Sequence, residues 1–178
     1  MITDSGANQS ILGAQWHIVS QSDRTTTVEG WAPEMKKDDM RIASGLTKTT
    51  LPNGTSILLL VNEAVNLGTG DSLLSSNQVG SYGIHVDDDL FFGTGHIITS
   101  ERHGMDVPLE SEGALTFVRI TAPTENDIEQ LHIVQLTDDA AWDPYGISIP
   151  RAFANLTRAE MRAPTTEHAK IIQRRFGH

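Results

Sequence analysis

The sequence predicts a mostly β fold with one short helix inside it and a helical extension at its C-terminal end. Through about residue 120 the chain alternates short segments of branched residues with turn residues, which is typical of strands joined by tight connections. Hydrophobic residues make up 38% of the 178 residues, which is enough for a single core and argues against wholesale disorder. Beyond residue 150 the turn signals give way to a helical pattern.

The strand signals begin in the first third of the chain. Thr25–Gly30 and Asp39–Ser44 are short segments bounded by turn residues, and the first is rich in branched residues, which favour extended backbone. The Asn53-Gly54 pair then predicts a tight hairpin, because both residues tolerate positive φ. The unbroken apolar run at Ser56–Val61 predicts a returning strand that is buried on both faces.

The next segments alternate between helix and strand. Small polar residues after Leu73-Leu74 predict a short helix that ends near Tyr82. Thr124, with acidic residues directly after it, predicts the start of a second short helix that runs through Gln130. Further strands are expected at Ile84–Val86, His96–Thr99, Val107–Leu109, Leu115–Ile120 and Ile133–Thr137.

The chain divides by composition into three parts. Residues 1–122 form the predicted β domain, and residues 123–149 form a linker that holds the second helix, a strand and the loop Trp142–Gly146. Residues 150–178 form a basic extension with two expected helices, Arg151–Arg162 and Thr166–Arg175. No internal repeat or low-complexity tract is present.

Charge separates the body of the chain from its tail. Residues 1–149 carry 7 basic and 21 acidic side chains, whereas residues 150–178 carry 6 basic and 2 acidic ones. The acidic body argues against nucleic acid as its partner, because phosphates would be repelled. The tail is either a solvated helical face, which is the more common case, or a contact for nucleic acid.

The absence of cysteine excludes several classes of protein. With no cysteine in the chain, a disulfide scaffold, a thiolate zinc site and a cysteine nucleophile are all excluded. An intracellular, cytoplasmic location is therefore expected. No apolar run is long enough to span a bilayer, and residues 1–4 show no signal peptide, so no membrane partner is expected.

One motif carries specific chemistry, Asp4-Ser5-Gly6-Ala7. Ile2 precedes it, and a polar then apolar run follows it. This loop resembles the active-site loop of the retroviral-type aspartic proteases, the retropepsins. In that family two aspartates held about 3 Å apart share one proton, so that one acts as the base on water and the other polarises the scissile carbonyl.

The resemblance extends to the order of later segments. Glu29, Gly30, Trp31, Ala32 and Pro33 stand where the family has the flap that covers substrate. Leu73, Leu74 and Ser75 stand where it has an apolar pair and a small residue beneath the active loop, followed by a helix. The segment through Gln78 is closest to the copia-type retrotransposon branch. The resemblance covers about residues 1–120 and implies a closed acid-protease barrel for domain 1–122.

The resemblance implies an aspartic endopeptidase that processes a polyprotein and needs no cofactor or metal. Asp4 is the catalytic residue, Ser5 bonds to the partner loop, and Gly6 and Ala7 shape the turn. Asp71-Ser72 is followed by Leu73 instead of Gly, so the second aspartate must come from an identical subunit of a homodimer. Only three residues precede Asp4, where the family has further strand, and this favours an alternative: a catalytically inactive, retropepsin-like dimerisation or binding module from a truncated or domesticated retroelement.

Other candidate sites have simpler explanations. Asp87–Asp89 fits a turn better than a metal site, and the seven histidines lack the spacing of zinc ligands. No Gly-x-Ser-x-Gly elbow supports a serine hydrolase, and Gly93-Thr94-Gly95 fits a hairpin turn. Trp16 is expected in the core, whereas Trp31 fits substrate contact and packing equally well.

Overall fold

The fold is described from a computed structural model, which describes residues 1–30, 36–91 and 95–146. The chain divides into two units, Met1–Pro144 and Tyr145–His178, and every element described below belongs to the first unit. The two helices expected after residue 150, and Trp31, Ala32 and Pro33 of the expected flap, lie outside the described residues.

The chain is mostly β, as predicted, with two short α-helices and one 3₁₀ turn among the described residues. The helices are α1 (Ser76–Ser81) and α2 (Glu125–Gln130), and the 3₁₀ turn is η2 (Glu101–His103). The strands are β1 (Ile2–Asp4), β2 (Ile11–Leu12), β3 (His17–Val28), β4 (Lys37–Thr50), β5 (Ser56–Asn66), β6 (Leu73–Ser75), β7 (His85–Asp87), β8 (Ile97–Ser100), β9 (Met105–Pro108), β10 (Glu110–Glu112), β11 (Leu115–Phe117) and β12 (Ile133–Gln135).

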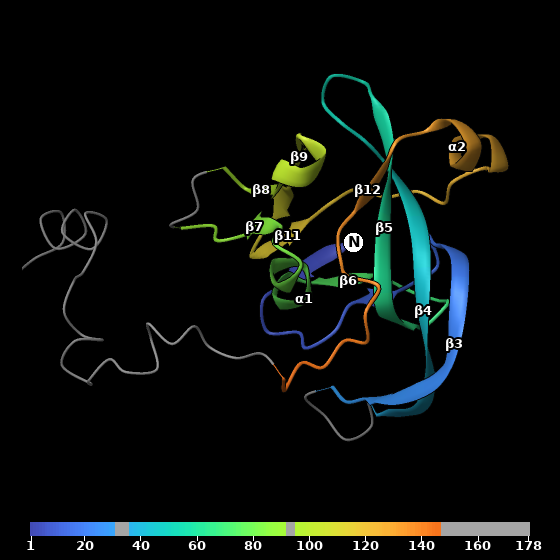
Figure 1. Cartoon of the computed structure of the whole chain (residues 1–178). Coiled ribbons are helices and arrows are strands. Elements are labelled where there is room, and N and C mark those ends of the chain that lie inside the picture. Colours follow the sequence, from blue (N-terminus) through green and yellow to red (C-terminus); the bar gives the residue numbers. More distant parts are fainter. Residues whose placement is uncertain (31–35, 92–94, 147–178) are drawn as a thin grey trace, which may run out of the picture. The chain divides into compact units, whose positions relative to one another are not determined.

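The strands form a large sheet and a small one (Figure 1). In the described part of the chain the large sheet runs β10-β11-β1-β6-β2-β5-β4-β3, and β12 pairs with β5. The small sheet has the order β7-β8-β9. Strands β10 and β3 are the two ends of the path, so the hydrogen-bonded ladder of the described residues does not close on itself.

The β4–β5 hairpin confirms the strongest turn signal. Gly54 has φ 85° and its N–H donates to the Leu51 carbonyl oxygen at 2.9 Å, while the Thr55 N–H donates to Asn53 Oδ1. The predicted strand after this turn is β5, and both of its faces are buried as expected, since Ile57, Leu58 and Leu59 are 0% exposed. The predicted strand at Asp39–Ser44 lies within β4.

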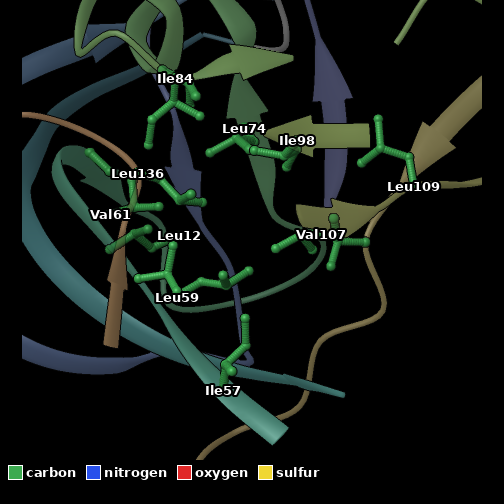
Figure 2. Packing of buried hydrophobic residues seen from close by; sticks show 14 of the residues in the cluster. Leu12, Ile57, Leu59, Val61, Leu74, Ile84, Ile98, Val107, Leu109 and Leu136 are labelled. Atoms are coloured by element: carbon green, nitrogen blue, oxygen red, sulfur yellow. The ribbon is translucent and has the colours of Figure 1, made fainter. Parts of the chain in front are cut away.

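One apolar core joins both sheets (Figure 2). Leu59 of β5, Leu12 of β2 and Leu74 of β6 belong to the same cluster as Ile98 of β8 and Val107 of β9. Each fully buried aliphatic side chain contributes about 1.5–3 kcal/mol relative to an exposed one. Strands β2 and β6, which lie beside the expected active loop, are therefore held in place by buried side chains of this core.

Most later elements follow the sequence pattern. The helix α2 begins after Thr124, whose hydroxyl accepts from the Asp127 N–H, and the Asp127 carboxylate accepts from the Thr124 N–H in return. This is the capping arrangement that the threonine and nearby acids predict. The expected helix after Leu74 is α1, and Tyr82 is its C-cap residue, close to the predicted end. Four strands end within a few residues of their predicted bounds: β7, β8, β9 and β12.

The structure differs from the prediction in the bounds of two strands and in the presence of several very short ones. The strand β3 begins at His17 instead of Thr25 and ends at Val28, while β11 ends at Phe117 instead of Ile120. The sequence does not predict strands β1, β2, β6 and β10, because each has only two or three residues. Strands β1, β2 and β6 are held by partners far away in the chain, whereas β10 pairs with the neighbouring β11. Among the described residues, no helix is long and apolar enough to cross a membrane.

Candidate active site

Asp4 is the last residue of β1, and the chain turns directly after it. The Gly6 N–H donates to Asp4 Oδ1 at 2.7 Å, which fixes the carboxylate at the mouth of the turn. Asp4 is partly exposed, and Ser5 and Gly6 are exposed. The loop from residue 4 to residue 10, which we call the active loop, therefore presents its carboxylate to solvent while its two ends enter the sheet as β1 and β2.

Gly6 is needed for a close approach and not for an unusual backbone conformation. A Cβ atom built on Gly6 would lie 3.2 Å from Asp4 Oδ1, and the residue is not in the left-handed region. Such a contact is tighter than ordinary van der Waals packing, so a side chain here would displace the carboxylate. The sequence motif and the local geometry thus agree on a small residue two positions after the aspartate.

Strand β6 lies beside β1 and supports the active loop. The two strands run parallel, with Ile2 opposite Leu73 and Asp4 opposite Ser75. The Ser75 hydroxyl donates to the Ala7 carbonyl oxygen at 2.6 Å, so it fixes the far side of the turn. The Ser75 N–H donates to Ser10 Oγ at 3.0 Å. The structure therefore brings Leu73–Ser75 directly against the active loop.

The helix α1 makes two further contacts with the active loop. Asn77 Nδ2 donates to the Ser5 carbonyl oxygen at 2.7 Å. Gln78 is 2% exposed, and its Oε1 accepts from the Ser10 N–H at 3.0 Å. Its Nε2 donates to the carbonyl oxygens of Asn62 and Glu63 on β5, at 3.2 Å and 3.1 Å. Gln78 thus joins the end of the active loop to the central strand.

An open hollow of about 460 Å³ lies in front of Asp4. Two more acidic side chains, Asp88 and Asp89, line it, and Ser76 Oγ at the start of α1 donates to Asp88 Oδ2 at 2.8 Å. The hollow is lined by Ile2, Thr3, Asp4, Ser5, Asp88, Asp89, Ala114, Leu115 and Thr116. Across residues 1–30, 36–91 and 95–146, no three potential metal ligands gather closely enough to hold an ion.

The expected flap belongs to the β3–β4 hairpin. Val28 pairs with Lys37, so the connection between them is the tip of this hairpin. Glu29 and Gly30 lie at the start of the tip and are exposed. The structure therefore supplies a hairpin at the expected place in the chain, and the covering role of its tip stays a prediction.

Two supporting residues have no role in the sequence-based prediction, Glu63 and Trp142. The Glu63 carbonyl oxygen accepts from Gln9 of the active loop, and its carboxylate accepts from the Trp142 backbone N–H. The sequence places Gln78 in the segment after Leu74, but it does not predict the hydrogen bond from Ser10 to its side chain. Trp142 lies in a loop, as predicted, and its indole N–H donates to the Asn8 carbonyl oxygen at 2.7 Å. The only sequence signal for this contact was a large aromatic residue in a segment rich in turn residues.

No family model, curated protein or solved structure matches this chain. The function of the chain is therefore inferred from its own residues and from the geometry of the loop at Asp4.

Proposed function

We propose that this protein is an aspartic endopeptidase that acts on polypeptide chains as a homodimer. Asp4 of each subunit would contribute one carboxylate, and the pair would share one proton. The ionised carboxylate accepts a proton from water as the water attacks the scissile carbonyl carbon, and the protonated carboxyl donates a hydrogen bond to the carbonyl oxygen. The carboxyl that took the proton from water then donates it to the leaving amine as the C–N bond breaks. These steps require no cofactor or metal.

A single observation carries the proposal. The Asp4 carboxylate is partly exposed at the end of β1, in a turn whose backbone is held by hydrogen bonds from β6 and α1. Gly6 bonds to the carboxylate, while Ser75 and Asn77 bond to carbonyl oxygens of the same turn. Such a preorganised carboxylate beside an open hollow is what acid and base chemistry on a bound polypeptide requires.

A second copy of the chain is the source we propose for the second carboxylate. Asp71, the other Asp-Ser pair in the sequence, is not among the residues that line the hollow in front of Asp4. A two-fold axis beside Asp4 would place identical groups face to face, which suits a pair that must share one proton. Asp88 lines the same hollow and is the alternative partner within one chain.

The finer expectations belong to the same proposal. The fold would be a closed acid-protease barrel. Gly30–Pro33 would cover the substrate, and Ser5 would bond to the loop of the other subunit. The substrate would be a polyprotein in the cytoplasm, and the basic tail at 150–178 is the one segment suited to contact nucleic acid.

The test is cleavage of an unfolded polypeptide between about pH 4 and 6, where a shared-proton pair is competent. The parent chain, Asp4→Asn and Asp88→Asn would be purified in parallel. We expect cleavage by the parent and by Asp88→Asn but not by Asp4→Asn. Loss of cleavage in both variants would indicate a pair within one chain, and equal cleavage by all three would indicate a contaminant. A folded parent that never cleaves would support the alternative, a non-catalytic dimerisation or binding module.

A further inference from the structure

Glu63 occupies an irregular position in the central strand. Gly45 lies opposite Val61 and Ala43 lies opposite Ala64, so β5 has one extra residue in this interval. Glu63 lies in this bulge with φ 54°, in the left-handed region. A non-glycine residue in that region costs about 1–2 kcal/mol. A glycine would avoid this cost, so we infer that the contacts of the Glu63 side chain offset it.

The backbone of Glu63 accepts two hydrogen bonds from the active-loop side. A bulge takes a residue out of regular ladder pairing and leaves its carbonyl group free for other donors. Gln9 Nε2 donates to the Glu63 carbonyl oxygen at 2.6 Å, and Gln78 Nε2 donates to it at 3.1 Å. The backbone of Glu63 is therefore joined both to the active loop and to α1.

The carboxylate of Glu63 joins two other segments of the chain. Arg24 of β3 donates from one guanidinium nitrogen to both carboxylate oxygens, at 2.5 Å and 2.6 Å. The backbone N–H of Trp142 donates to Glu63 Oε2 at 3.1 Å. The Glu63 side chain is 12% exposed and the Arg24 side chain is 49% exposed, so the carboxylate is shielded from water while the guanidinium group is half open to it.

Trp142 links Glu63 to the active loop. Its backbone bonds to Glu63, and its indole N–H bonds to the Asn8 carbonyl oxygen in the middle of the active loop. The segment that leads to Trp142 is anchored at Thr137, which exchanges hydrogen bonds with Asn62 next to Glu63. The active loop is thus held by α1 and β6 through one set of contacts and by Trp142 through another.

We propose that Glu63 is a positioning residue that sets the active loop, the β3–β4 hairpin and the segment 138–142 in one arrangement. Its carboxylate holds Trp142, and Trp142 holds the active loop at Asn8. The same carboxylate holds Arg24, and with it the hairpin whose tip is the expected flap. The catalytic consequence of this coupling depends on the proposed endopeptidase function, whereas the coupling itself does not.

The first test measures the coupling without any activity. Glu63→Gly keeps the backbone acceptor and suits the positive φ, so it removes only the carboxylate contacts. Asp39→Gly is the matched control, because exposed Asp39 also has positive φ, at 58°. The readouts are the indole N–H resonance of Trp142, assigned with Trp142→Phe, and amide exchange at Ser10.

We expect Glu63→Gly to shift the indole resonance and to speed Ser10 exchange about tenfold, because the active loop loses one of its two supports. Glu63→Gln should keep most of the parent behaviour, since its amide oxygen can still accept from Arg24 and Trp142. An indole resonance and a Ser10 exchange rate that match those of Asp39→Gly would overturn the proposal.

The second test measures the catalytic consequence in the full chain. Arg24→Ala should mainly raise KM, because it frees the hairpin, and Trp142→Phe should mainly lower kcat, because it frees the active loop. Glu63→Gly should do both and reduce kcat/KM about tenfold or more, with recovery in Glu63→Gln. Unchanged KM and kcat in Glu63→Gly would contradict the positioning role. A parent without activity would instead count against the proposed function, and the exchange measurements would still decide the coupling.

Discussion

Gln78 provides the most quantitative test of how the active loop is held. Replacing it with Met keeps the side-chain length but removes three hydrogen bonds at a site that is 2% exposed. The buried Ser10 N–H would lose the partner that fixes it, which costs about 1–3 kcal/mol. The carbonyl oxygens of Asn62 and Glu63 keep other donors, so each of those losses costs about 0.5 kcal/mol.

The expected loss of unfolding free energy for Gln78→Met is therefore about 1–3 kcal/mol, after about 1 kcal/mol for the more favourable burial of the Met side chain is subtracted. Urea denaturation followed by circular dichroism measures this loss, with an unchanged m-value if the transition stays two-state. Gln130→Met, at the exposed end of α2, is the matched control and should change stability by less than about 0.5 kcal/mol. A Gln78→Met variant as stable as that control would refute the reasoning.

Two further predictions concern packing and acid stability. A Cβ on Gly13 would lie 2.3 Å from the Gly70 carbonyl oxygen, so Gly13→Ala should lower stability in thermal unfolding by about 3 kcal/mol, while Gly80→Ala, which meets nothing within 4 Å, should not destabilise. The hydrogen bond from Lys48, together with those from the N–H and the hydroxyl of Thr124, lowers the pKa of Asp127 to about 2 from its ordinary value of 3.8. Because the folded-state pKa is depressed, this stabilisation is present above about pH 4 and is lost as the pH falls towards 2, so the stability difference between the parent and Asp127→Asn should shrink over that interval in acid titrations followed by circular dichroism. A difference that stays constant from pH 5 to about 2 would contradict this assignment.

The sequence predicts those elements whose signals are local. The Asn53-Gly54 turn, the apolar run of β5 and the cap at Thr124 each depend on residues that are neighbours in the chain, and the structure contains all three. Propensity and pattern are informative at this range, because turn and cap geometry is decided within a few residues.

The missed elements depend on partners far away in the chain. Strand β1 has three residues and is defined by Leu73–Ser75 on one side and Phe117 on the other. No local pattern marks so short a strand, because the distant pairing supplies its hydrogen bonds. The position of Glu63 is equally invisible, since a glutamate does not suggest a left-handed backbone.

The candidate site divides in the same way. The motif at Asp4–Ala7 and its expected neighbours at Leu73–Ser75 could be found from residue order, and the structure places them side by side. The buried amide of Gln78 and the indole of Trp142 could not, because a polar helix residue and a loop aromatic have many possible partners.

The most direct test of the central claim, that each active site uses Asp4 from two subunits, is a mixing experiment. Parent and Asp4→Asn chains would be combined in equal amounts, allowed to exchange subunits, and assayed at constant total concentration. If both carboxylates are required, random pairing leaves about one quarter of the dimers with Asp4 in both subunits, so activity should fall to about one quarter of the parent value. Activity of about one half would mean that each chain acts alone, and it would contradict the shared pair.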